Sequence, residues 1–271
     1  MQFEMQLLWA AIVAYVLTGV VAIFGVFLGK RPERAVLGLL VLALALHSAA
    51  IGLRWERLGH GPYITMFEQL SIKVWGLAFM FLLAYWRYKP VRPIAALVMP
   101  VIFVILGWML MHDPDKGEVP AFYHSTWLFI HIGFGKLFSG TMLVTLGIAA
   151  VVLLRGAGIG LTRLARMPDD ERLHDLAYRF MALGLIFDTL MLITGSIWAQ
   201  DAWGRYWGWD PLETWSLITW LTLAFALHLR FAMKVTPRTG AVMVVIVFVL
   251  GFITFLGVPF VTKALHSGPP L

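Results

Sequence analysis

One connection in the last third of the chain combines tryptophans, glycines and charges in an unusual density. It reads WAQDAWGRYWGWDPLETWSLITW, and its tryptophans are Trp198, Trp203, Trp207, Trp209, Trp215 and Trp220. An aromatic belt at a membrane surface accounts for one or two tryptophans at a helix end, where the ring is buried and the indole N–H reaches water. Six of them, interleaved with Gly204, Gly208 and Pro211, which shape the backbone path, instead favour a flat aromatic surface for a large planar apolar ligand.

Fixed charges lie among these aromatic residues. Asp210 and Glu213 fall at the start of the next apolar run. Because anions are favoured near a helix N-terminus, we expect both carboxylates to position the turn. Arg205 and the indole N–H groups are suited to hold the carboxylates of a ligand. No acid–base pair is evident, so the pattern favours binding and positioning over proton-transfer catalysis.

Histidines supply the second kind of chemistry. The apolar run from Trp127 to Leu154 would be roughly 42 Å long as a helix, whereas a bilayer core is about 30 Å thick. Its outer end therefore projects and places His131 near the outer interface, the side on which His266 follows the last span. Two imidazoles that face each other across an aromatic slot can ligate a haem iron. A pair of ordinary interfacial histidines is the alternative.

Two further histidines lie within apolar runs, where an ionisable residue is a functional candidate by default. His228 lies near Arg230 at the inner end of the seventh run, and His47 lies in the middle of the second. The two would ligate one haem poorly, because His47 is roughly 18 Å and His228 about 3 Å from the inner boundary. A hydrogen bond to a neighbouring helix explains His47 as well as a ligand role does.

Charged residues inside the apolar runs complete the set of candidates. Lys136 and Asp188 lie in the fifth and sixth runs and either pair with each other or act separately. In the second case Lys136, which is five residues inward of His131, would meet an anionic group of the ligand. Glu68, near the start of the third run, is expected at the membrane interface.

Composition identifies the elements that must position these residues. The chain has 271 residues, of which 60% are hydrophobic and only 13% charged, and a mean hydropathy of +0.82. Its apolar runs are continuous rather than alternating, so the sequence predicts an all-α integral membrane protein. The absence of cysteine excludes disulfides, thiolate metal sites and thiol–disulfide chemistry. The net charge of +6 does not indicate nucleic-acid binding, because the basic residues gather at helix ends.

Eight apolar runs are long enough to span a membrane. They cover residues 6–29, 35–53, 66–86, 93–111, 127–154, 180–199, 213–229 and 240–260. We expect a single polytopic membrane domain over residues 1–271, with the tryptophan-rich segment at about 198–220. The N-terminus has no basic region or cleavage site of a signal peptide and is expected to form the first span.

The distribution of lysine and arginine predicts the orientation. Most of them fall in alternate connections, which places those connections in the cytoplasm. Both termini and the tryptophan-rich connection are then outside the cytoplasm. Residues 159–178 alternate leucines with charges, a pattern that we interpret as a helix lying on the inner membrane surface.

The tryptophan-rich connection resembles the WWD signature of the haem-handling proteins of cytochrome c biogenesis, most closely the System II proteins of the CcsA or ResC type. The similarity extends along most of the chain: GHGPYITMFEQ follows the second span, WLFIHIG opens the fifth, LHLR ends the seventh and LHS follows the last. Lys136 and Asp188 depart from the family pattern.

The resemblance implies a site and a set of partners. In that family two outer histidines ligate a displayed haem, and they correspond to His131 and His266 here. A histidine in the span after the signature is associated with haem inside the membrane and corresponds to His228. The resemblance further implies a bacterial inner membrane, b-type haem as substrate and bound ligand, a CcsB or ResB type membrane partner, and an apocytochrome c with a CxxCH motif. The chain would be part of a holocytochrome c synthase, or haem lyase, complex.

The cofactor-binding residues on this hypothesis are His131, His266, His228, Trp198, Trp203, Trp207, Trp209, Asp210, Glu213 and Trp215. The three histidines among them are the expected axial ligands of haem iron. The main alternative is a b-type electron-transfer subunit that oxidises quinol, which would need two bis-histidine sites stacked within the bundle. A haem-delivery protein of the System I kind is a second alternative, and a haem-free transporter is a third.

Overall fold

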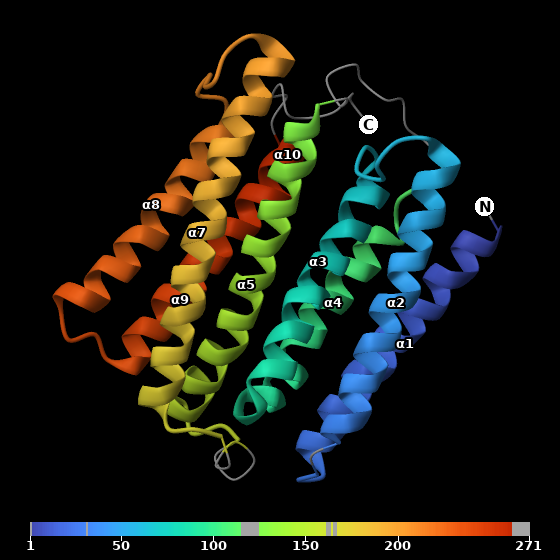
Figure 1. The fold of residues 1–271 in the computed structure, drawn as a ribbon. Helices are drawn as coiled ribbons and strands as arrows, with labels where there is room; N and C mark the ends of the chain where they lie inside the picture. The colour runs from blue at the N-terminus through green and yellow to red at the C-terminus, as the bar shows by residue number, and fades with distance from the viewer. Residues whose placement is uncertain (1, 31, 115–124, 161–163, 165–166, 262–271) are drawn as a thin grey trace. The chain divides into compact units, whose positions relative to one another are not determined.

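The computed structural model describes residues 2–30, 32–114, 125–160, 164 and 167–261 (Figure 1). Over these ranges it contains eight helices that are long and apolar enough to cross a membrane, which confirms the predicted all-α multi-span fold. They contain the helices α1 (Gln2–Phe27), α2 (Glu33–Leu58), α3 (Met66–Arg87), α4 (Ala95–Met109), α5 (Thr126–Gly156), α7 (Asp170–Trp203), α8 (Pro211–Ala232) and α9 (Pro237–Phe252). The fourth and eighth spans extend beyond α4 and α9 and cover Arg92–Met109 and Pro237–Gly257. A short 3₁₀ segment, η1 (Lys89–Ile94), precedes α4, and a π-helical segment, η3 (Ile253–Gly257), leads from α9 into α10 (Val258–Val261).

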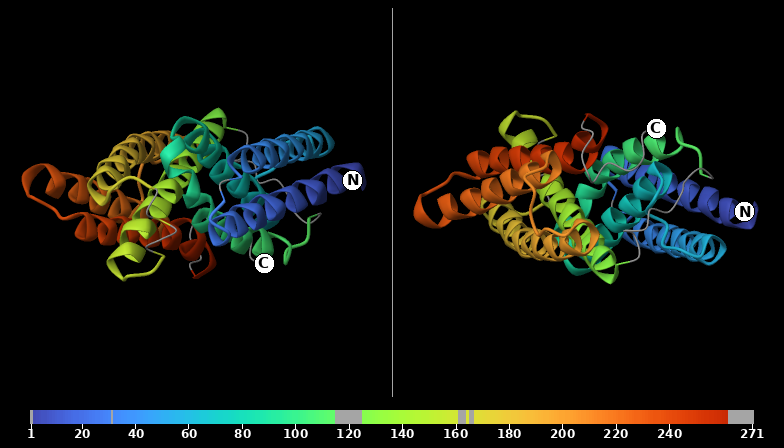
Figure 2. Two further views of the ribbon diagram at one scale, coloured as in Figure 1. Left: turned by 90° about the horizontal axis from the view of Figure 1, so that it is seen from below. Right: turned by 90° about the horizontal axis from the view of Figure 1, so that it is seen from above.

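The helices form two compact units. Unit 1 holds residues 1–118 and 157–169, and unit 2 holds residues 119–156 and 170–271. In unit 1, α1 packs on α2, α2 on α3, α3 on α4, and α4 on α1. In unit 2, α5 packs on α7, α7 on α8, α8 on α9, and α9 on α5, so each unit is a closed ring of four helices. Figure 2 views the helices end-on. Each ring buries its own apolar interior. The single polytopic domain expected from the sequence stays a prediction.

Helix α7 is longer than the sequence predicted. It begins at Asp170 and runs without a break to Trp203, so residues 170–178 belong to it and the interpretation of residues 159–178 as one surface helix is wrong. The reason is burial: Leu173 and Ala177 lie in the interior of unit 2. An ion pair of 2.8 Å between Arg155 and Asp170 joins the end of α5 to the start of α7.

His47 has a structural role. Its side chain is fully buried in unit 1, and its ring nitrogens lie 3.3 Å from the Tyr15 hydroxyl of α1 and 2.9 Å from the Ser71 hydroxyl of α3. A buried imidazole with partners on both ring nitrogens is satisfied without any ligand. The hydrogen-bonding explanation of His47 is therefore confirmed.

A buried charge cluster connects three helices of unit 1. Arg54 of α2 is only 5% exposed and forms ion pairs with Glu4 of α1, at 2.8 Å, and with Glu68 of α3, at 2.9 Å. Arg57 forms a second ion pair with Glu4, also at 2.8 Å. Glu68 additionally accepts the backbone N–H of Thr65 in a capping box that starts α3. This carboxylate is 1% exposed and enclosed by its partners, and its expected place at the membrane interface stays a prediction.

Arg54→Ala should strongly destabilise unit 1, because it leaves two buried carboxylates without their shared cation. Breaking a buried ion pair from one side costs about 3–5 kcal/mol. Thermal unfolding of the detergent-solubilised chain, followed by circular dichroism, measures the loss. Arg57→Ala is the matched control: it should cost less, because the side chain of Arg57 is 32% exposed and Glu4 keeps Arg54. Equal losses in the two variants would contradict this account of the cluster.

Candidate functional site

His131 is held on α5 by contacts with the facing helix α7. Its Nδ1 lies 2.9 Å from the backbone carbonyl oxygen of Met191, and its ring stacks on Trp198 with a centroid separation of 6.1 Å and an interplanar angle of 18°. A carbonyl oxygen only accepts, so Nδ1 carries the proton and donates. In this tautomer the basic lone pair is on Nε2. A backbone carbonyl is one of the partners, beside carboxylates and water, that orient metal-ligating histidines in proteins.

Gly195 makes this arrangement possible. A Cβ atom on Gly195 would lie 2.6 Å from His131 Nδ1, a separation that real Cβ atoms essentially never show. Met191, Gly195 and Trp198 occur at positions i, i+4 and i+7, so they form one stripe on α7 that receives the imidazole. Sequence reasoning missed Gly195 and the Met191 carbonyl, although the small residue one turn before Trp198 was a usable signal.

The tryptophans divide into groups rather than forming one flat surface. Trp198 is 4% exposed, and it contacts Trp203 edge-to-face with ring centroids 4.9 Å apart. Trp207 and Trp209 form a second edge-to-face pair at 5.7 Å. Trp198 thus supports His131 from the interior, whereas Trp209 is 69% exposed.

Trp215 and Trp220 belong to α8, the helix after the connection. The backbone carbonyl of Trp215 accepts hydrogen bonds from the hydroxyls of Thr219 and Thr254, and the Trp220 indole N–H donates to the Thr189 hydroxyl of α7 at 2.8 Å. These contacts fasten α8 to its neighbours within unit 2.

The connection between α7 and α8 is short, and α8 begins with a capping box. The Asp210 carboxylate accepts the backbone N–H of Glu213 at 2.8 Å, and the Glu213 carboxylate accepts the N–H groups of Gly208, at 2.7 Å, and Asp210, at 3.3 Å. Pro211 occupies the first helical position. The prediction that Asp210 and Glu213 position the turn is confirmed.

Trp209 has a left-handed backbone with φ of 56°, in the described chain the one non-glycine residue with a positive φ. This conformation is unfavourable for a bulky residue and costs about 1–3 kcal/mol. The capping box on its C-terminal side and Gly208 on its N-terminal side hold it there. The outcome is an indole displayed on the surface of unit 2.

Two hydrogen-bond donors in the connection between α7 and α8 can bind an anion. The Trp207 indole nitrogen is buried and has no hydrogen-bond partner among the described residues. The guanidinium of Arg205 packs against Gly208, where an added Cβ would be 2.7 Å from it. An unmet buried N–H and a cation on one short loop suit the carboxylate of a bound molecule.

Asp188 and Lys136 of unit 2 do not pair with each other among the described residues. Asp188 is fully buried, and within the described ranges neither of its carboxylate oxygens has a hydrogen-bond partner and no ion pair joins it to Lys136. The predicted alternative in which these two residues pair is therefore wrong. Asp188 lies on α7 about one turn before Met191, the residue whose carbonyl contacts His131.

The remaining histidines of the hypothesis are distributed differently. His266 lies outside the described residues. His228 is exposed near the C-terminal end of α8, on the stripe that also carries the exposed apolar side chains of Ile218, Leu221 and Phe225. Close by, Arg230 pairs with Asp175 of α7. The structure brings together His131, Trp198 and Trp203 as one chain of aromatic contacts, and Trp207, Trp209, Asp210 and Glu213 as one loop.

An eight-helix membrane protein with this tryptophan-rich connection has clear relatives. Residues 63–266 match the family described as cytochrome C assembly protein, and the chain belongs to that family. It is 32% identical over 255 residues to the cytochrome c biogenesis protein CcsA of Guillardia theta, an alignment that covers 85% of this chain and 84% of the relative. The CcsA of Synechococcus sp. (strain CC9902) is 30% identical over 290 residues, covering 96% and 94%. The chain is thus a multi-pass membrane protein of cytochrome c biogenesis, of the CcsA type.

A solved structure shares the fold. The cytochrome c heme lyase CcmF superimposes with a TM-score of 0.71 over 99% of this chain, at 19% sequence identity. The chain spans about half of that longer protein, 48% of its length. At this identity the superposition supports the helical arrangement, and the chemistry must be argued from the residues.

Gly195→Ala should displace His131 and destabilise unit 2 by about 1–3 kcal/mol, the usual cost of overpacking. The double variant Gly195→Ala with His131→Ala should recover most of that loss, because the colliding ring is gone; a double-mutant cycle on thermal unfolding measures the coupling. Gly133→Ala on α5 is the matched control, since its Cβ would meet nothing within 4 Å. Additive effects of Gly195→Ala and His131→Ala would contradict the contact.

Asp210→Ala should weaken the start of α8 by about 1 kcal/mol, the typical value of a helix cap. Asp210→Asn should cost little, since asparagine caps as well as aspartate does. The same unfolding measurement, with limited proteolysis at the connection, tests both variants. If asparagine is as damaging as alanine, the negative charge of Asp210 does more than cap the helix.

Proposed function

We propose that this protein receives haem in the membrane, displays it at the outer face against the tryptophan-rich connection, and supports its thioether attachment to apocytochrome c. The single observation that carries the proposal is the His131 geometry, in which the Met191 carbonyl fixes the tautomer that presents a basic Nε2. The names of the relatives, cytochrome c biogenesis protein and heme lyase, support the same function.

The bound substrate is held from both sides in this proposal. His131 supplies one axial ligand to b-type haem, and His266, by the family resemblance, supplies the other. Trp207, Trp209 and Trp215 provide aromatic surface for the porphyrin, whose burial away from water stabilises binding. The unmet Trp207 N–H and the Arg205 guanidinium receive the propionates.

The backbone strain at Trp209 supports a binding role for the loop. A left-handed tryptophan is retained only where surrounding contacts enforce it, and such outliers cluster at ligand sites. Asp210 and Glu213 act through the backbone by holding the loop in shape. The chain's own contribution to attachment is then positioning, with the haem vinyl groups turned toward the CxxCH thiols of the incoming apocytochrome.

The wider assignment follows the same reasoning. We propose a bacterial inner membrane location with the tryptophan-rich connection outside the cytoplasm, and a CcsB or ResB type partner in a System II synthase. Haem would enter near His228 and move outward to His131. Because Asp188 and Lys136 do not pair with each other, each can interact electrostatically with the charged groups of haem.

Replacing His131 with glycine should abolish the bis-histidine haem spectrum of the purified complex and stop holocytochrome c formation. Added imidazole should restore part of both, because it can occupy the space of the missing ring and ligate iron. Absorption spectra and covalent-haem staining of a reporter cytochrome are the measurements. His266→Gly should behave in the same way if it is the second ligand.

His112→Ala, on the turn after α4 in unit 1, is the control histidine and should leave both signals unchanged. Normal cytochrome c maturation in the His131→Gly, His266→Gly double variant would refute the assignment. Haem that is retained and reduced by quinol, without an apocytochrome, would instead favour the electron-transfer alternative.

A further inference from the structure

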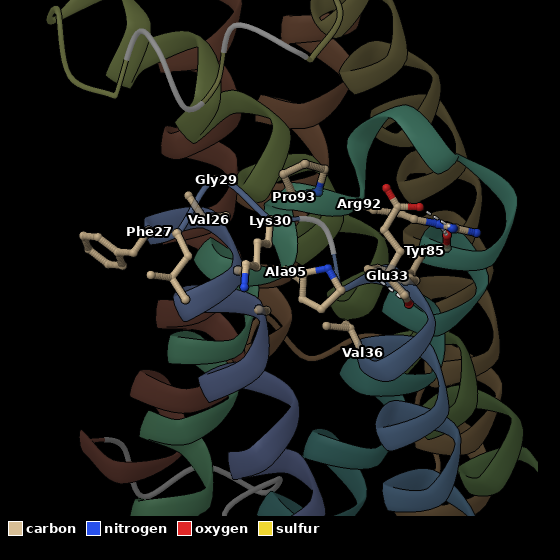
Figure 3. Close-up of a pocket in the computed structure, with 14 residues that line it drawn as sticks. Val26, Phe27, Gly29, Lys30, Glu33, Val36, Tyr85, Arg92, Pro93 and Ala95 are labelled. Carbon is tan, nitrogen blue, oxygen red and sulfur yellow. Dashed lines mark hydrogen bonds and ion pairs between the residues drawn. The ribbon is translucent and has the colours of Figure 1, made fainter.

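Unit 1 contains a cavity that the haem hypothesis does not use. It has a volume of about 350 Å³ and lies where the end of α1, the start of α2, the end of α3 and η1 meet (Figure 3). That volume is within the range of small-ligand pockets. Its walls are apolar at Val26, Phe27 and Val36, and its charged side chains are Lys30, Glu33 and Arg92.

Two of the charged residues neutralise each other. Arg92 forms an ion pair of 2.6 Å with Glu33 and donates through Nε to the Tyr85 carbonyl at 2.9 Å. Figure 3 shows these three residues together at one side of the cavity. Their mutual contacts make this side of the wall electrically balanced and sterically fixed.

Lys30 is the remaining charged residue of the cavity, since Glu33 and Arg92 compensate each other. In the part of the chain that the structure describes, no ion pair or side-chain hydrogen bond engages its ammonium group, whereas Glu33 already holds Arg92. The N-terminal end of α2, which is positively polarised, also lines the cavity. The cavity therefore has a net positive potential and favours an anion.

The position of Lys30 is set by the backbone. Gly29 adopts φ of 65°, and the N–H of Lys30 donates to the Gly25 carbonyl at 2.8 Å while the N–H of Gly29 donates to Val26 at 3.2 Å. These two bonds make the Schellman motif that ends α1. Because the turn is fixed, the backbone of Lys30 is held at the rim of the cavity that its residue lines.

The surroundings indicate which anion. Phe24, Phe27 and Leu28, at the same end of α1, are about two-thirds exposed, as expected of side chains that contact acyl chains. Arg34, Arg87 and Lys89 are exposed at this end of the unit. Basic pockets between membrane helices that combine such features bind anionic lipid headgroups.

We propose that this cavity binds the headgroup of an anionic phospholipid, with its phosphate at Lys30 and its acyl chains along the exposed apolar end of α1. The site belongs to unit 1, whereas His131 and the tryptophan-rich connection belong to unit 2, so the proposal does not depend on haem binding. A bound lipid would stabilise the junction of α1, α2 and η1.

The test is a titration of the full chain in neutral detergent, read by native mass spectrometry, with phosphatidylglycerol and with phosphatidylcholine of the same acyl chains. We expect one saturable site that prefers phosphatidylglycerol. Lys30→Gln should weaken that binding about fivefold, as expected for removing one interfacial cation. Lys89→Gln, which removes an equal charge at the same end but outside the cavity, should leave it unchanged.

Three results would overturn the proposal. They are equal binding of the two lipids, equal weakening in Lys30→Gln and Lys89→Gln, and displacement of phosphatidylglycerol by inorganic phosphate at comparable concentration. The third would identify a free-phosphate site instead. Circular dichroism of both variants verifies that each retains the helical fold, which is expected because both side chains are exposed.

Discussion

The candidate site depends on one close approach between two helices. His131 of α5 can donate to the Met191 carbonyl and stack on Trp198 only because Gly195 of α7 has no side chain. In a membrane, helices gain little from hydrophobic association with each other, so small residues that let groups approach closely decide how they pack. Here that general rule also sets the tautomer and the direction of a histidine. The positions of the tryptophans follow, since Trp198 supports the imidazole and Trp203 packs against Trp198.

Sequence reasoning could predict the features that depend on composition and local pattern. The eight spans follow from continuous apolar runs, and the capping role of Asp210 and Glu213 follows from the order of residues in WDPLE. It could not predict features that depend on which helices meet. Glu68 is buried because it pairs with Arg54 of a different helix. Helix α7 extends back to Asp170 because Leu173 packs in the interior of unit 2. The separation of Lys136 from Asp188 is of the same kind, because residues on neighbouring spans need not share a face.

In unit 1 the buried charged side chains near one end of α2 are paired, whereas Lys30 near the other end has no ion-pair partner among the described residues. Near the C-terminal end, Arg54 is enclosed by Glu4 and Glu68, which compensate its charge. Near the N-terminal end, Glu33 compensates Arg92 and leaves Lys30 uncompensated beside a cavity. Buried charges that are fully paired fix how helices pack, whereas a charge left over at a membrane interface attracts a ligand. The same residue types thus serve architecture at one end and recognition at the other.

If haem enters near His228, as proposed, the placement of this histidine has a consequence for how haem reaches it. This histidine shares an exposed stripe of α8 with Ile218, Leu221 and Phe225, so it faces away from the four-helix interior of unit 2. A hydrophobic molecule dissolved in the bilayer could dock there sideways, by lateral diffusion, and the ring of helices would not have to part to admit it. A route along the outside of α8 also requires no water-filled passage, so the permeability barrier of the membrane would stay intact while cargo is loaded.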